Sequence, residues 1–145
     1  MVQGTTDHRF SFPVDESLDL LGMTIDNQLN FDKHVSLVCN KVNNQLKVMI
    51  RFRKLISTSA MLKLYKAFIL PHFLYCSTVW HFCSSRNRDK LEALNRRALH
   101  IVFHDKDSTY QQLLDKAETT SLYNQRIQSM LTTIYKCLHF ANYPS

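Results

Sequence analysis

Positively charged side chains are the residues of this chain whose type and spacing most clearly indicate a chemical role. Lys47, Arg51 and Lys54 follow one another at intervals of four and three residues, and side chains at these intervals share one face of a helix. The phosphates of a nucleic-acid backbone present a similar row of opposite charges. We therefore expect a surface that holds the backbone and reads little base sequence, built from Lys33, Lys47, Arg51, Lys54, Arg86, Lys90 and Arg97.

The charge is concentrated in the middle of the chain. The formal net charge is +6, but residues 33–104 contain thirteen Lys or Arg and two acidic residues, a net charge of +11. The remaining residues contain five Lys or Arg and ten acidic residues, a net charge of −5. Such a distribution favours a polyanionic partner. The alternative is a solvated basic face that binds no ligand.

Histidines, cysteines and aspartates offer two weaker candidates for a metal site. His72, Cys76 and Cys83, with His81 nearby, contain the residue types that bind zinc but lack the paired short spacings of structural sites. Residues 105–107 hold two aspartates, which we interpret as the acidic start of a helix. We therefore expect no metal site, no cofactor and no catalytic residue in this chain.

Composition excludes further classes of function. The chain has 145 residues with 2 Gly and 3 Pro, which is typical of one domain of mostly regular structure. Gly4 and Gly22 lie too far apart for a phosphate-binding glycine loop, and we expect no small-molecule substrate. The uncharged run 67–85 contains proline and histidine and indicates a core segment rather than a membrane span.

The four cysteines form no CxxC motif, and no signal peptide is visible. We interpret them as reduced, mostly buried thiols of an intracellular protein, either nuclear or cytoplasmic.

Hydrophobic periodicity predicts a mainly α fold, in which a short N-terminal β-hairpin precedes a bundle of about five to six helices. The hairpin domain covers residues 1–29, with strands at 8–12 and 18–26, and the helical domain covers residues 30–145. We expect helices at about 31–55, from 57 to a stop or kink at Pro71, 73–82, 87–103, a short one after 108–111, and 121–139.

Particular residues support these helices. The first helix has an apolar stripe from Val35 to Met49 and a start capped by Asn30 or Asp32. Ser108 and Gln111 match a capping box. The last helix has apolar residues at helical spacing, namely Ile127, Met130, Leu131, Ile134 and Leu138.

Two segments resemble a known family. The run LLGMTID at 20–26, with Leu29, Phe31 and His34, is similar to the segment that closes the palm of non-LTR (LINE-type, jockey-like) retrotransposon reverse transcriptases. The run LYKAFILPH at 64–72, with Tyr75, Cys76 and Trp80, resembles the next block of the same proteins. The resemblance covers roughly residues 18–143 and continues through Arg96, Arg97, Ala98, Ser121, Leu122, Arg126, Leu131, Tyr135 and Lys136.

The resemblance implies the end of the palm followed by the thumb, the part of these enzymes that grips the template–primer duplex. The partners implied are RNA–DNA or DNA duplex and the palm domain itself, which this chain lacks. The family's catalytic Asp-Asp pair is absent, so we expect no polymerase activity from this chain on its own. An alternative is a degenerate or domesticated remnant that acts as a helical protein-interaction module.

Overall fold

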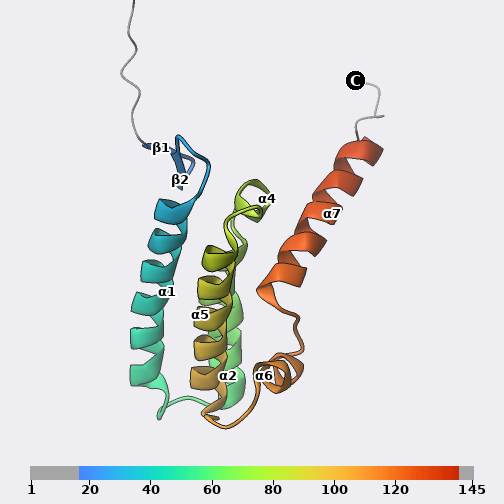
Figure 1. Ribbon diagram of the computed structural model, residues 1–145. Coiled ribbons are helices and arrows are strands. Elements are labelled where there is room, and N and C mark those ends of the chain that lie inside the picture. The colour runs from blue at the N-terminus through green and yellow to red at the C-terminus, as the bar shows by residue number, and fades with distance from the viewer. Residues whose placement is uncertain (1–16, 141–145) are drawn as a thin grey trace, which may run out of the picture.

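The computed structural model describes residues 17–140, in which a β-hairpin precedes a series of helices (Figure 1). Long segments alternate in direction, so α1 and α5 run one way while α2–α3 and α7 return (Figure 1). The predicted mainly α fold with an N-terminal hairpin is confirmed. The elements are β1 Ser17–Leu20, β2 Met23–Asp26, α1 Asp32–Phe52, α2 Thr58–Leu64, the π-helix η1 Tyr65–Ile69, α3 Leu70–Leu74, α4 Ser77–Trp80, α5 Ser85–Phe103, α6 Tyr110–Lys116 and α7 Leu122–Phe140.

The hairpin forms because Leu21 and Gly22 make a tight turn. Both residues have positive φ, 51° and 80°, as a two-residue turn with the twist of a hairpin requires. The prediction of one continuous strand over 18–26 is therefore wrong, since this segment folds back on itself and supplies both β1 and β2. Met23 is buried against the helices. The other predicted strand, 8–12, lies outside the described residues.

Helix α1 buries its predicted apolar stripe. Val35, Val42 and Leu46 are almost completely inaccessible. Neither proposed cap is used, because the N-cap residue is Phe31 in the left-handed conformation, with its own side chain buried. The Asp32 carboxylate instead accepts a hydrogen bond from the Asn87 amide of α5. The first turn of α1 is therefore tied to its neighbour.

Pro71 does not stop the second helical segment. Met61, Tyr65, Ile69 and Phe73 are buried at intervals of four residues, a spacing that drifts about 40° per step on a regular α-helix. The wider turn of η1 corrects this drift, with the Leu70 N–H bonded to the Tyr65 carbonyl. A π turn also accommodates the missing N–H of proline. The predicted stop at Pro71 is therefore wrong, since the helical structure of η1 continues directly into α3, which contains Pro71.

The predicted helix over 73–82 is interrupted. Helix α3 ends at Leu74, and Cys76 adopts a positive φ of 50° before α4 begins. Helix α4 then directs Trp80 into the core, where its side chain is fully buried.

The two helices that follow start at capping residues. Ser84 accepts a hydrogen bond from the Asn87 N–H and starts α5. The capping box of α6 consists of Thr109 and Gln112, one residue later than predicted. The Ser108 hydroxyl instead donates to the Asp105 carboxylate.

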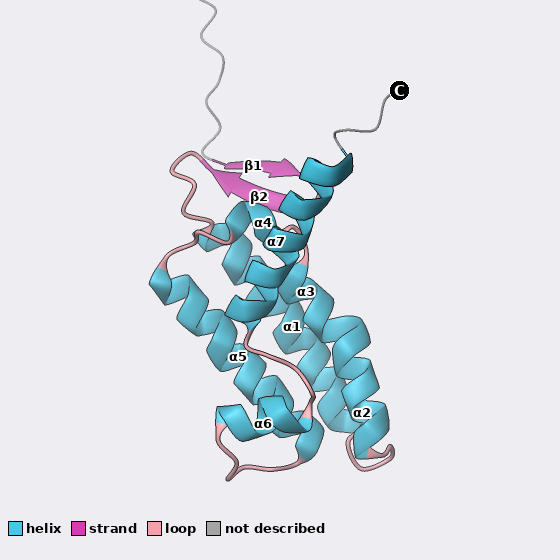
Figure 2. Cartoon of the chain, turned by 90° about the vertical axis from the view of Figure 1, so that its right-hand side faces the viewer, coloured by secondary structure: helices cyan, strands magenta, loops and turns pink. Residues whose placement is uncertain are grey.

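Helix α7 packs against α3, α4 and α5 (Figure 2). Leu122 and Arg126 are buried, whereas Leu131 is 57% and Leu138 is 67% exposed. The apolar periodicity therefore predicts this helix correctly. Among the described residues, however, no element packs over the apolar side chains of its second half, namely Leu131, Ile134 and Leu138. The upper end of α7 stands away from α1 and α5 (Figure 1).

A chain of hydrogen bonds crosses the interior through α5. The Tyr65 hydroxyl donates to the Asn95 side-chain oxygen, and the Asn95 amide donates to the Tyr110 oxygen over 2.8 Å. The Tyr110 hydroxyl in turn donates to Glu92 over 2.6 Å. Glu92 also accepts the Tyr123 N–H over 2.8 Å, at the N-terminus of α7. One network thus joins η1, α5, α6 and α7.

A stack around Trp80 holds the other end of the bundle. The Arg126 guanidinium lies 5.0 Å from the centre of the Trp80 ring, a cation–π contact that is strengthened by burial. The His34 ring of α1 lies 5.6 Å from the same indole. The Trp80 N–H donates to the Tyr75 carbonyl. These contacts connect α1, α4 and α7.

Replacing Tyr65 with Phe tests the network. Tyr65→Phe leaves the Asn95 oxygen without its buried donor, so we expect the free energy of unfolding to fall by about 1–3 kcal/mol. The matched control is Tyr75→Phe, whose hydroxyl donates to the Leu21 carbonyl from a side chain that is 53% exposed. A surface change of this kind shifts stability by less than about 0.5 kcal/mol. Urea unfolding measures both, and equal losses would contradict the role of the network.

The buried histidine predicts acid sensitivity. Burial and the nearby charge of Lys41 lower the pKa of His34 below its ordinary 6.5. Below pH 6.5 the unfolded chain therefore binds a proton that the folded protein does not, and stability falls as the pH falls. We expect lower urea midpoints at about pH 5.5 than at about pH 7.5.

The expected cause of the acid sensitivity can be checked by substitution. Burial also lowers the pKa of His72 and His81, so His34→Leu should weaken the pH dependence without abolishing it. His104→Gln, at an exposed position, is the control. If His34→Leu left the pH dependence of stability unchanged, groups other than His34 would cause it.

Candidate nucleic-acid interface

Helices α1 and α5 run side by side and pack against each other (Figure 1), and a hollow lies along their junction. Its volume is about 480 Å³. The α1 wall presents small or neutral polar groups and the α5 wall presents two of the predicted cations. The lining residues are Ser36, Cys39, Asn40, Asn43, Lys90, Ala93, Leu94 and Arg97.

A second hollow of about 270 Å³ continues the first toward the C-terminal ends of both helices. It shares Ala93 and Arg97 with the first, and most of its lining is basic or imidazole. The lining residues are Arg53, Ala93, Arg96, Arg97, His100, Ile101, His104 and Lys106. We call the two hollows together the α1–α5 groove. Within the described residues, no Asp or Glu lines either part.

Helix geometry explains why cations line this groove. Lys90, Arg97 and His104 are spaced by seven residues on α5, which is close to two helical turns. A face about 100° around the same helix is buried through Leu91, Ala98 and other residues. The Arg97 guanidinium reaches across the groove and donates to the Asn43 oxygen over 3.4 Å. This contact holds one cation at the centre of the groove.

Six of the seven predicted binding residues form three groups. Lys90 and Arg97 line the groove. Arg86, one turn before Lys90, and Lys47, one turn after Asn43, are exposed beside it. Arg51 and Lys54 are exposed near the end of α1 and do not line it.

Lys33 lies at a different place. Its amino group donates to the Ser17 hydroxyl over 3.3 Å. It also lines a separate hollow beside the hairpin, together with Asp19 and Asp32. The structure therefore places Lys33 among acidic residues rather than with the other cations.

Three cations of the groove escaped the sequence prediction. Arg53 shares the angular position of the core stripe, but α1 ends at Phe52, so the half-buried Arg53 side chain reaches the groove. Arg96 lies 5.5 Å from the Tyr110 ring, which positions its guanidinium. Lys106 follows α5 in a loop. Only the position at which each helix ends could have indicated Arg53 and Lys106.

The residues considered for zinc lie apart from one another. His72 accepts a hydrogen bond from the Gln45 amide over 2.9 Å. The ring of His81 packs 5.2 Å from Phe82 and 5.3 Å from Tyr123. No group of three or more His, Cys, Asp or Glu side chains between residues 17 and 140 is arranged to hold a metal ion. The geometry of this part of the chain does not support the zinc alternative.

Asp105 has a structural role in the loop before α6. Its carboxylate accepts a hydrogen bond from the Lys116 ammonium over 2.6 Å. It also accepts hydrogen bonds from the backbone N–H groups of Asp107 and Ser108. These contacts hold the pKa of Asp105 well below its usual range.

The burial of the cysteines differs from the sequence prediction. All four thiols are free, but only Cys83 is buried, and Cys137 is exposed. The prediction of mostly buried thiols is therefore wrong. No helix in the described part of the chain has the length and apolar character that crossing a membrane requires.

Comparisons with known proteins give one relative. A Caenorhabditis elegans protein called "Uncharacterized protein B0403.1" is 26% identical over 121 residues. The match covers 81% of this chain but only 61% of the relative. No protein-family model and no solved structure match this chain. A functional assignment therefore depends on the chemistry of the groove.

Proposed function

We propose that this chain is the C-terminal, thumb-like part of a non-LTR retrotransposon reverse transcriptase and holds a template–primer duplex in the α1–α5 groove. The observation that carries the proposal is the lining of the groove, where every ionisable group except Cys39 is a lysine, an arginine or a histidine. The resemblance of residues 20–34 and 64–80 to that family supports the same reading.

The dimensions of the groove suit a nucleic-acid backbone. Between Arg86 and His104 the rise of α5 is about 27 Å, which corresponds to about eight base pairs. Asn40 and Asn43 add neutral hydrogen-bonding groups between the cations. Such a surface binds phosphates and sugars and carries little sequence preference.

In this proposal the chain contributes binding and no chemistry. Phosphoryl transfer by the two-metal route needs carboxylates that hold the ions, and these belong to the palm of the family. Leu18, Leu20 and Leu21 of the hairpin and Leu131 of α7 are more than half exposed. They offer an apolar surface on which a palm domain would pack.

The exposed face of α7 favours a second candidate function. Leu131, Ile134 and Leu138 lie on one side of the helix and are 48–67% exposed. A degenerate or domesticated remnant would use such a face as a helical protein-interaction module. Concentration-dependent association in analytical ultracentrifugation, with no affinity for nucleic acid at low salt, would favour this alternative.

Neutralising two groove cations tests the main proposal. We expect Lys90→Gln/Arg97→Gln to weaken binding to a labelled RNA–DNA hybrid and to a DNA duplex alike. We also expect it to lower the slope of log affinity against log salt by about two, because each lost phosphate contact removes about one released counterion. Fluorescence anisotropy over a salt series gives both quantities.

The matched control removes the same charge elsewhere. Lys63→Gln/Lys66→Gln changes α2 and η1, outside the groove, and should leave the salt slope unchanged. Equal effects of the two double variants would mean that binding follows net charge rather than the groove. Absence of binding to either duplex at low salt would refute the proposal.

A further inference from the structure

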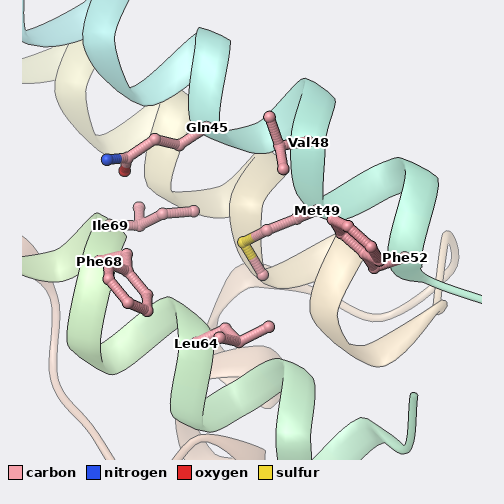
Figure 3. Close-up of a pocket in the computed structure, with 7 residues that line it drawn as sticks. All are labelled: Gln45, Val48, Met49, Phe52, Leu64, Phe68 and Ile69. Atoms are coloured by element: carbon pink, nitrogen blue, oxygen red, sulfur yellow. The ribbon is translucent and has the colours of Figure 1, made fainter. Parts of the chain in front are cut away.

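An apolar groove lies on the other side of α1, between α1 and η1 (Figure 3). Its volume is about 280 Å³. Side chains from both helices point into it (Figure 3). We call it the α1–η1 groove, and it is lined by Gln45, Val48, Met49, Phe52, Leu64, Phe68 and Ile69.

Large apolar side chains stay in contact with solvent there. Phe68 is 57%, Val48 is 50% and Phe52 is 47% exposed. Single exposed apolar residues are common on protein surfaces, but here three from two helices line one hollow. Gln45 is the one polar lining residue, and its amide is bonded to His72.

The π turn shapes one wall of this groove. Tyr65 and Ile69 are completely buried, and they hold η1 against the core. Phe68, between them in sequence, is left on the surface. Pro71 and the buried stripe impose the wider turn. Phe68 is therefore held in place by the regular backbone of η1, not by a freely moving loop.

The charges around the groove have one sign. Lys41 lies one turn before Gln45 on α1, and its charge lowers the pKa of His72, which places it at the Gln45 end. Lys63 is exposed one residue before Leu64 of the opposite wall, whereas Lys66 is two residues from both Leu64 and Phe68 and therefore lies on the far side of that helix. No Asp or Glu occurs between residues 33 and 88. An occupant that complements this surface is apolar toward the groove and acidic around it.

From these observations we infer that the α1–η1 groove docks an acidic amphipathic helix of a partner protein. Its apolar side chains would contact Val48, Phe52 and Phe68, and its carboxylates would face Lys41 and Lys63. This is the helix-in-groove mode of recognition, with anchors at helical spacing.

Other ligand classes fit the groove less well. Its volume lies at the lower end of the usual range of about 300–1,000 Å³ for small-molecule sites, and its lining includes a single polar residue, Gln45, to orient such a ligand. A nucleic acid would place its phosphates over an apolar floor whose polar residue, Gln45, already bonds to His72, which is unfavourable. An apolar side chain gives up no hydrogen bonds when it enters the groove, and it displaces water from its own surface and from the groove.

The two grooves can be occupied independently. Asn43 lines the α1–α5 groove and Gln45 lines the α1–η1 groove. These residues are two positions apart, about 200° around the helix axis. Binding in one groove therefore leaves the other open.

The test uses the full chain and a labelled synthetic peptide. The peptide is a helix with leucines at i, i+3, i+4 and i+7 and glutamates on the other face. We expect saturable binding that Phe68→Glu and Val48→Glu each weaken by about tenfold or more. Val79→Glu is the matched control, since Val79 of α4 is 50% exposed, like Val48, but does not line the groove, and it should bind like the unmodified chain. Circular dichroism verifies that each variant is folded.

Charge variants separate this inference from the proposed function. Lys41→Gln/Lys63→Gln should weaken peptide binding and spare the duplex, whereas Lys90→Gln/Arg97→Gln should do the reverse. A peptide with lysine in place of glutamate should bind more weakly. Absence of saturable peptide binding would overturn the inference, as would equal binding by Phe68→Glu. Self-association that Phe68→Glu abolishes would assign the groove to a second copy of the chain instead.

Discussion

Asn95 and Glu92 of α5 carry the hydrogen bonds on which the rest of the structure depends. Asn95 is completely buried between the hydroxyls of Tyr65 and Tyr110, and Glu92 accepts from Tyr110 and from the first N–H groups of α7. Polar groups buried in this way are costly unless each finds its partner. The arrangement of η1, α6 and α7 that satisfies them is therefore strongly preferred over other packings of the same apolar stripes.

The position of α5 determines what the surface can do. Because this helix packs against α1, α2, α6 and α7, one narrow face is left for charged residues, and Lys90 and Arg97 occupy it. Helix α1 is placed at the edge of the bundle and has two accessible flanks. One flank meets the cations of α5, and the other meets the apolar side chains of η1. Both grooves therefore result from the placement of α1 between α5 and η1.

Much of the fold could be predicted from local patterns. The stripe from Val35 to Met49 specified α1, and helical spacing specified α5 and α7. Errors arose where neighbouring choices have similar local energies. Thr109 rather than Ser108 caps α6, and the segment around Gly22 turns back instead of continuing as a strand. Pro71 was recognised as a disturbance, but the π turn that absorbs it depends on Tyr65 and Ile69 being buried together.

The sequence by itself determined the helical class, the charge of the middle segment and the absence of a glycine loop for nucleotides, because periodicity and composition are local properties. Only the tertiary structure decided which cations meet. It joined Lys90 and Arg97 with Arg53, which the end of α1 releases from the core stripe, and it separated Lys33, which lies beside the hairpin. The physical reason is that a groove is made by two helices, and their relative placement depends on side chains buried far from its surface.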